Sequence, residues 1–309
     1  MSRRHASTIA VILAAFALGC RPARTEAPVT AAGAPRSLQF AGDFKGPLGV
    51  QLWSFREQAK ADPAAMLRMV RDMGFTHVET AGLYGLPVAR VAELVRDAGL
   101  RTTSMHVGYD ELKKDMPTVI ANAKALGATY VGLAWYPHDR SGFTESDARK
   151  AIADFNAFGR ALKDGGLNFF YHNHGYEPVP YGDGTLLDLI IRETDPSLVS
   201  FEMDVLWTWL PNVDPVALIR KYPGRFKLMH IKDMKPGVAR GSLAGGIPDS
   251  LKAAIGQGQV DWGALMEAAA RDGFVHYYLE DETPDPVRTA PQSVRYLESL
   301  KYPSRTVRP

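Results

Sequence analysis

The sequence predicts an α/β protein built as a single (β/α)8 TIM barrel, which follows an N-terminal signal and tether. Eight short apolar runs alternate with eight amphipathic stretches over about 260 residues. Parallel strands need crossover connections, and the amphipathic stretches would supply them as helices. A doubly wound open sheet is the alternative fold. No glycine-rich phosphate loop follows any early strand, which weighs against that alternative.

The apolar runs predict the strands, and each run is short enough for one barrel strand. The first run, 49–53, follows Leu48, and the last ends at the acidic cluster 280–282. The eight predicted strands are 49–53, 75–80, 100–106, 128–135, 167–174, 198–204, 225–231 and 274–280.

Helix start and stop signals lie between these runs. Asp62 is suited to cap the first helix, with Pro63 at its first position. Glycines follow several of the stretches, at Gly74, Gly99 and Gly127, where a helix often ends. The eight predicted helices are 63–73, 88–98, 111–126, 145–163, 185–193, 215–221, 262–271 and 286–300. Residues 236–258 are glycine-rich and irregular, either a lid or a surface insertion.

Composition excludes several classes of function. The 309 residues are 46% hydrophobic and 23% charged, as in an ordinary globular protein. The formal net charge is +2, from 36 basic and 34 acidic residues. No basic run is interleaved with aromatic residues, so we expect no nucleic-acid partner. The single cysteine excludes an intramolecular disulfide, and the sequence leaves the oligomeric state open, an oligomer included.

The N-terminus resembles a bacterial lipoprotein signal. A basic start is followed by a short apolar run, 9–18, and then by Ala17-Leu18-Gly19-Cys20. We expect a signal peptide at 1–19, a lipid on Cys20, a flexible tether at 20–45 and a TIM-barrel catalytic domain at 46–309. The protein would be exported to the periplasm and touch the membrane only through that lipid. The alternative is an ordinary signal peptide cut near Ala32 or Ala34.

Potential metal ligands follow four of the predicted strands. In a (β/α)8 barrel the carboxyl ends of all strands meet at one face, so residues far apart in sequence converge there. Imidazole and carboxylate together suit Mn²⁺, Zn²⁺, Co²⁺ or Fe²⁺ better than Mg²⁺. One divalent metal is therefore expected. The segments are Tyr171-His172-Asn173-His174, Glu202-Met203-Asp204, His230-Ile231-Lys232-Asp233 and Leu279-Glu280-Asp281-Glu282.

Side-chain alternation separates inward from outward residues in these segments. His172 and His174 are two apart and share a face, as do Glu202 and Asp204, and His230 and Lys232. Buried carboxylates are costly unless they are paired or metal-bound, so Asp204 is the better ligand and Glu202 a buried ion-pair partner. A single buried histidine is more often hydrogen-bonded in a core, but two alternating histidines at a strand end favour a site.

These motifs, with Gly256-Gln257-Gly258-Gln259-Val260-Asp261-Trp262, resemble the xylose-isomerase-like TIM-barrel family over roughly residues 48–302. The family includes sugar-phosphate isomerases and epimerases, inosose dehydratases and endonuclease IV. The resemblance implies one divalent metal held by His172, Asp204, His230 and Glu280. Many relatives have glutamate where this chain has His172, so the fourth ligand stays open among His172, His174 and Glu177. Trp207 stands where endonuclease IV has a second histidine, which argues against a DNA-repair enzyme.

Further candidates lie at the ends of the other strands. Aromatic faces at a barrel mouth suit stacking on a sugar ring, and the polar tips of a glutamate and a histidine there need partners. Ordinary packing under loops is the alternative. The expected substrate-binding residues are Trp53, Glu79, His106, Trp135 and Trp207.

The expected reaction is an isomerisation, epimerisation or lyase reaction on a non-phosphorylated keto-sugar through an enediolate, and a 3-keto-glycoside lyase is one such enzyme. Export disfavours sugar phosphates, and no phosphate cradle is evident. Glu177, His174 or Glu280 would act as base, and Lys232 would hold the enediolate oxygen. The alternatives are a non-catalytic, lipid-tethered sugar-binding protein and a metal-dependent hydrolase of phosphodiesters or esters.

Overall fold

The computed structural model describes residues 36–303. The predicted signal peptide at 1–19, Cys20 and the first part of the tether lie outside the described residues. Among the described helices, none combines the length and the apolar character needed to cross a membrane.

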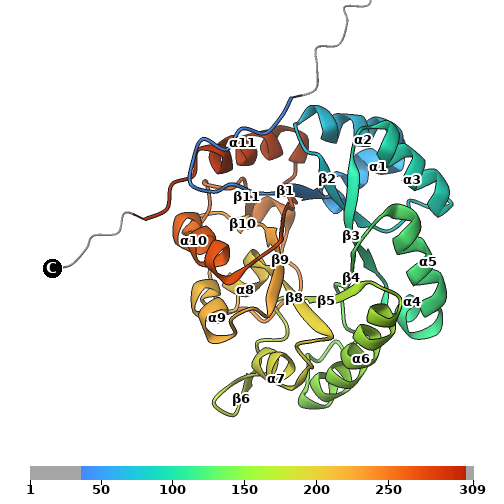
Figure 1. Ribbon diagram of the computed structural model, residues 1–309. Coiled ribbons are helices and arrows are strands. Elements are labelled where there is room, and N and C mark those ends of the chain that lie inside the picture. Colours follow the sequence, from blue (N-terminus) through green and yellow to red (C-terminus); the bar gives the residue numbers. More distant parts are fainter. Residues whose placement is uncertain (1–35, 304–309) are drawn as a thin grey trace, which may run out of the picture. The chain divides into compact units, whose positions relative to one another are not determined.

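Eight parallel strands close into a barrel, which confirms the predicted fold. Their order around the barrel is β1-β12-β9-β8-β5-β4-β3-β2, and β1 pairs with both β12 and β2 to close it. Figure 1 shows the strands in the centre and the helices in a ring around them. The strands are β1 (Leu48–Gln51), β2 (His77–Ala81), β3 (Arg101–Val107), β4 (Tyr130–Leu133), β5 (Asn168–His172), β8 (Val199–Asp204), β9 (Phe226–Ile231) and β12 (His276–Leu279).

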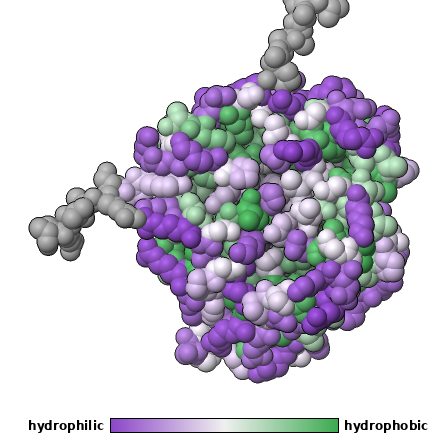
Figure 2. All heavy atoms as spheres, viewed as in Figure 1, coloured by the Kyte–Doolittle hydropathy of each residue, from purple (hydrophilic) through white to green (hydrophobic). Residues whose placement is uncertain are grey.

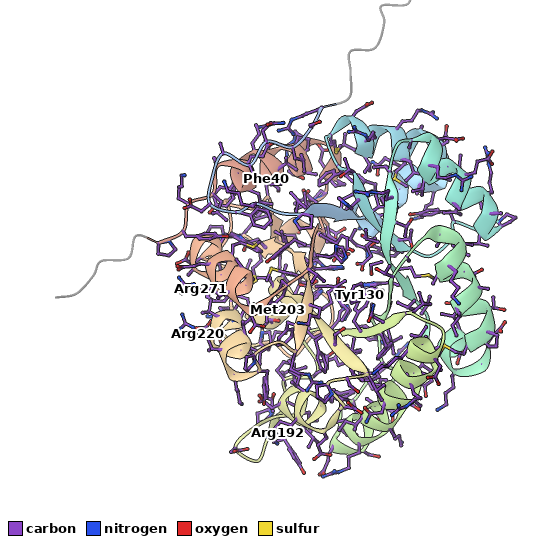
Figure 3. The ribbon with its side chains drawn as sticks, viewed as in Figure 1. Phe40, Tyr130, Arg192, Met203, Arg220 and Arg271 are labelled. Atoms are coloured by element: carbon purple, nitrogen blue, oxygen red, sulfur yellow. The ribbon has the colours of Figure 1, made fainter. Side chains whose placement is uncertain are left out.

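The outer helices follow the predicted pattern closely. Asp62 accepts a hydrogen bond from the Ala65 amide and so caps the helix that begins at Pro63. The main helices are α2 (Pro63–Asp72), α3 (Val88–Asp97), α5 (Met116–Leu126), α6 (Glu145–Asp164), α7 (Leu186–Glu193), α9 (Pro215–Lys221), α10 (Trp262–Asp272) and α11 (Pro286–Ser299). Arg192, Arg220 and Arg271 lie on the periphery in Figure 3, and hydrophilic residues cover most of the face in Figure 2.

The helix predicted over 111–126 is two helices, α4 (Tyr109–Lys114) and α5. Pro117 lies in the first turn of α5 and has no amide hydrogen, so a continuous helix would lose a hydrogen bond there. Asp115 ends α4 and caps α5, because its carboxylate accepts from the Thr118 amide.

Residues 36–45 differ from the predicted free tether, because they pack against the barrel domain. The Gly42 and Asp43 amides donate to the carbonyls of Glu298 and Leu300 at the end of α11. Phe44 is 2% exposed and stacks edge-on with Tyr277. Phe40, labelled in Figure 3, lies beside α11. Burial of Phe44 and partial burial of Phe40 hold this segment in place.

The loops after the strands carry short elements that the sequence pattern did not predict. The turn η1 (Leu52–Phe55) and α1 (Arg56–Ala61) follow β1, and α8 (Val205–Trp209) follows β8. Two small hairpins are β6 (Pro180–Tyr181) with β7 (Gly184–Thr185), and β10 (Asp233–Met234) with β11 (Lys252–Ala253), the latter preceded by the turn η2 (Asp249–Leu251). These elements build the walls of the carboxyl-terminal face.

Candidate metal site and substrate pocket

The barrel interior has an apolar floor. Phe170, Leu228 and Tyr278 form a buried cluster with Tyr130 packed against it, and Figure 3 places Tyr130 in the barrel centre. Gly132 is required beside them, since a Cβ there would lie 2.0 Å from the Phe170 ring. The floor closes the amino-terminal end, so polar groups gather toward the carboxyl-terminal end.

A layer of histidines and glutamates lies next to this floor. It consists of Glu79, His106, His172, Glu202 and His230. The alternation along β5 and β9 explains the layer, because His172 is two residues after Phe170 and His230 two after Leu228.

Glu202 is the centre of this layer. Its Oε2 lies 2.8 Å from His172 Nδ1, 3.0 Å from His106 Nε2 and 3.1 Å from His230 Nε2. Its other oxygen is buried and has no hydrogen-bond partner within residues 36–303. Burial, and then the negative charge of Glu79, raises the pKa of Glu202 to about 7.

Glu79 holds the other side of the layer. Its Oε1 lies 2.6 Å from His230 Nε2 and accepts from Gln51 Nε2 at 2.7 Å, while Ser104 donates to Oε2. Burial raises the pKa of Glu79, but the imidazoles of His106 and His230 outweigh burial and lower it. Both oxygens of the Glu79 carboxylate therefore have partners inside the barrel.

Above this layer lies a second group of donor atoms, from Asp204, His230 and Glu280. Their ligand atoms all lie within 4.8 Å of one another. His230 Nδ1 is 2.9 Å from Glu280 Oε2, and Asp204 Oδ2 is 3.6 Å from His172 Nε2. The predicted ligands His172, Asp204, His230 and Glu280 are thus brought together. His230 also belongs to a deeper group with His106, His172 and Glu202.

The donor set fits a divalent cation. Two carboxylates and two imidazoles are buried together, and the buried Asp204 Oδ2 faces Lys232 Nζ at 3.0 Å and His172 Nε2 at 3.6 Å. The two imidazoles each present one nitrogen to this group while the other nitrogen lies against a carboxylate, of Glu202 or Glu79. Carboxylates behind ligand histidines are common in metal sites, because they fix the tautomer and the ring orientation.

Lys232 bridges this group and the rim. Its Nζ lies 3.0 Å from Asp204 Oδ2, 2.6 Å from Glu280 Oε2 and 2.9 Å from Glu282 Oε2. Burial lowers the pKa of Lys232, but these three carboxylates outweigh burial and hold the pKa well above its ordinary value. The side chain therefore stays charged, with its ammonium also 5.4 Å from the centre of the Trp207 ring.

A cavity of about 350 Å³ opens above these groups. Predicted site residues that line it are Trp53, His106, Trp135, His172, His174, Trp207, His230, Lys232 and Glu280. The three tryptophans therefore stand around a polar floor, the arrangement expected for a ligand with both hydroxyls and an apolar ring face.

The loop after β10 covers part of this cavity. Gly245 and Gly246 line it, and a Cβ at Gly245 would lie 2.6 Å from the Trp135 ring. A Cβ at Gly175 would lie 2.3 Å from the Ala244 carbonyl oxygen. Of the two interpretations of residues 236–258, the structure supports a cover over the site.

His174 presents an imidazole to the cavity, between Trp135 and Trp207. Its Nδ1 is buried and has no hydrogen-bond partner in the part of the chain that the structure describes. Burial, and then the charge of Lys232, lowers the pKa of His174 to about 3. The ring is therefore neutral near pH 7 and keeps a free nitrogen lone pair.

Two predicted roles do not fit the geometry. Glu177, predicted as a base, does not line the cavity, because its carboxylate turns back to accept from the His174 amide at 2.9 Å and from the Tyr171 hydroxyl. Burial raises its pKa to about 8. Glu79, predicted at the mouth, is fully buried in the histidine–glutamate layer. Neither carboxylate is positioned to touch a ligand.

Two residues that line the cavity, Gln51 and Lys252, were not predicted from the sequence. Gln51 lines the cavity and donates to Glu79. Lys252 also lines it, is 5% exposed, and contacts Glu282 at 2.8 Å and Asp249 at 2.9 Å. Gln51 lies within the first predicted strand, 49–53, and ends the observed strand β1. Lys252 lies in the irregular segment and had no sequence signal.

Comparison with known proteins agrees with this architecture. Residues 67–300 match the family described as xylose isomerase-like TIM barrel. A sugar phosphate isomerase/epimerase from Parabacteroides distasonis superimposes with a TM-score of 0.66 at 28% identity, over 81% of this chain and 96% of that chain. The IolI protein, solved with a zinc atom, shares the fold, with a TM-score of 0.62 at 13% identity over 81% and 95% of the two chains.

The curated relatives match a shorter part of the chain. An inosose dehydratase from Lacticaseibacillus casei is 24% identical over 179 residues, which is 55% of this chain and 58% of the relative. One from Clostridium tetani is 24% identical over 155 residues, 48% of this chain and 51% of the relative. The chain thus spans little more than half the length of these relatives.

Proposed function

Because the chain belongs to the xylose isomerase-like TIM-barrel family, we propose that it is a divalent-metal-dependent lyase or isomerase of a non-phosphorylated keto-sugar. The observation that carries this proposal is the buried group of Asp204, His230 and Glu280 at the base of the tryptophan-lined cavity. An acidic and imidazole floor beneath aromatic walls suits a polyhydroxylated ring.

His172, Asp204, His230 and Glu280 would hold the metal. When bound, the metal would act as a Lewis acid on a ketone oxygen and so acidify the neighbouring C–H bond. Glu202 and Glu79 would orient the two imidazoles. A Zn²⁺, Mn²⁺, Co²⁺ or Fe²⁺ ion suits these ligands better than Mg²⁺.

Lys232 would stabilise the negative charge that develops on the substrate oxygen. Its ammonium is buried, is charged, and lies at the cavity floor beside Asp204 and Glu280. A fixed positive charge in a site shielded from water stabilises such an oxygen far more than the same charge in bulk water.

His174 is the base that the geometry favours among the three predicted residues. Its imidazole lines the cavity and is neutral near pH 7, so it can accept a proton from the substrate. Glu280 contacts His230 and Lys232 and belongs to the metal group, and Glu177 lies outside the cavity.

For a 3-keto-glycoside, these groups would catalyse an elimination. The base takes the C2 proton, the electrons of that C–H bond form the C1–C2 double bond, and the C1–O bond breaks. The aglycone oxygen leaves with the bonding electrons and takes up a proton, so no oxidant or reductant is needed. Return of the proton to another carbon or another face would give isomerisation or epimerisation instead.

The relatives support a carbohydrate substrate. An inosose dehydratase is an eliminating enzyme by its name, and the structural neighbour is named a sugar phosphate isomerase/epimerase. Lys232 and Lys252, the two lysines that line the cavity, are both paired with carboxylates. This pairing favours a non-phosphorylated substrate. Export and lipid anchoring through Cys20 remain part of the proposal, on the sequence alone.

The test is to incubate the full chain with a 3-keto-β-glucoside and Mn²⁺, Co²⁺ or Zn²⁺, and to follow aglycone release in deuterated water. Release, or deuterium at C2 of recovered substrate, is the expected result. Binding of the sugar with neither release nor exchange would instead favour a non-catalytic sugar-binding protein.

A further inference from the structure

A second cavity adjoins the first. It has a volume of about 390 Å³ and lies among η1, α1 and the loop between β2 and α3. Trp53 and Ala81 line both cavities, so the two spaces share a wall. The lining residues are Leu52, Trp53, Arg56, Ala59, Lys60, Pro63, Ala81, Tyr84 and Leu86.

The lining of this second cavity is largely apolar, whereas the floor of the metal-site cavity is polar and charged. It has no carboxylate or imidazole among its lining residues, and leucine, proline, alanine and aromatic side chains dominate. Its cations are Arg56 and Lys60, and the Arg56 guanidinium lies 5.2 Å from the centre of the Trp53 ring. Such walls suit a flat, apolar group with an electron-rich face.

Trp53 is held in place at the boundary. Its Nε1 donates to Glu282 Oε1 at 3.0 Å, and Glu282 lines the metal-site cavity. The Trp53 side chain, which is 45% exposed, therefore forms a wall shared by the polar cavity and the apolar cavity. A ligand that occupies both would pass along this side chain.

Tyr84 lines the apolar cavity together with Leu52 and Leu86. Its hydroxyl is buried and has no hydrogen-bond partner within the described residues. Because that oxygen is closed off from the cavity, the part of Tyr84 that a ligand could contact is its ring, which suits an aromatic group.

We propose that the second cavity is a subsite for an aromatic substituent of the sugar, an aryl aglycone that packs against the side chains of Trp53 and Tyr84. This assignment rests on the proposed function, because the sugar must occupy the metal-site cavity. The substrates would then be aryl glycosides rather than free sugars, alkyl glycosides or disaccharides.

The test measures binding apart from turnover. Phenyl β-glucoside, methyl β-glucoside and cellobiose lack the ketone that elimination needs, so the reaction proposed above cannot consume them. Isothermal titration of the metal-loaded full chain should show the phenyl glucoside binding about tenfold or more tightly than the other two. Equal affinities, preference for cellobiose, or no detectable binding of any of the three would overturn the subsite.

Two variants locate the preference. Leu86→Trp fills the cavity and should reduce the phenyl-to-methyl affinity ratio to about one. Tyr84→Ala removes an aromatic ring from the cavity wall and should weaken phenyl glucoside binding about fivefold. Val275→Trp, at an exposed position before β12, is the control for an added tryptophan and should keep the wild-type ratio. A ratio that Leu86→Trp leaves at the wild-type value would overturn the subsite.

The outcome is distinguishable from failure of the proposed reaction. A phenyl preference without aglycone release from the 3-keto-glucoside would reject the lyase and keep the subsite. Release without a phenyl preference would keep the lyase and reject the subsite.

Discussion

Replacing Lys232 with glutamine is expected to lower turnover by about 10²–10³-fold while the metal stays bound. The ammonium lies among Asp204, Glu280 and Glu282, so its removal takes a positive charge away from the carboxylates and does not weaken their attraction for a cation. The substrate oxygen, however, loses its fixed positive partner. Aglycone release from a 3-keto-glucoside and metal content by mass spectrometry measure the two effects separately.

Lys227→Gln is the matched control for this prediction. Lys227 lies on β9, which ends at the residue before Lys232, and it stands at an odd offset from Lys232, so its side chain points away from the barrel interior. It should retain wild-type turnover. If Lys232→Gln instead released the metal, Lys232 would be a residue that organises the ligands rather than one that acts on the substrate.

Replacing Glu202 with glutamine is expected to weaken metal binding about 10–100-fold. Glu202 Oε2 contacts His172 Nδ1 and His230 Nε2, so it holds both imidazoles with their other nitrogens toward the metal group. A glutamine keeps the shape but loses the charge and has only one accepting oxygen. Competition with a chelator at fixed pH measures the metal affinity.

Asp188→Asn is the control for loss of a buried carboxylate. Asp188 is 5% exposed and accepts from Lys221 and Tyr222, between the outer helices α7 and α9. Its metal affinity should equal that of the wild type. A Glu202→Gln variant that binds metal as tightly as Asp188→Asn would show that the histidine–glutamate layer does not support the metal group.

Much of this site could be predicted from the positions of the strand ends and from the alternation of side chains along each strand. His172, Asp204, His230 and Lys232 all come at the close of an apolar run, and the closed barrel brings such ends together. The alternation of side chains also predicts that Asp233 points to the opposite face from Lys232. In the structure Asp233 accepts a hydrogen bond from Trp262 Nε1 at 2.8 Å. These positions depend only on local pattern and on closure.

The depth of a side chain along the barrel axis could not be predicted from the sequence pattern. The register between β2 and β3 shifts between Val78 and Glu79, which pairs Glu79 with Ser104. Glu79 therefore lies inside the barrel, where it contacts His230, rather than at the mouth. Strand stagger is set by the whole closed sheet, so no single segment reveals it.

Local hydrogen bonds give other side chains orientations that the sequence pattern does not predict. Glu177 returns to the His174 amide instead of reaching the cavity. Asp204 combines two roles, because its Oδ1 accepts from the Trp207 amide to cap α8 while Oδ2 faces the metal group. The cavity beside Trp53 arises where η1 and α1 pack together. The apolar sequence 49–53 predicted a single strand, so it gave no indication of η1.

Metal content measured by mass spectrometry, on the wild type and on a double variant with Asp204→Ala and His230→Ala, tests the metal site directly. We expect about one equivalent of Zn, Mn, Co or Fe in the wild type and none in the folded double variant. A wild type that contains no metal, and takes up none after chelation and reloading, would contradict the metal site.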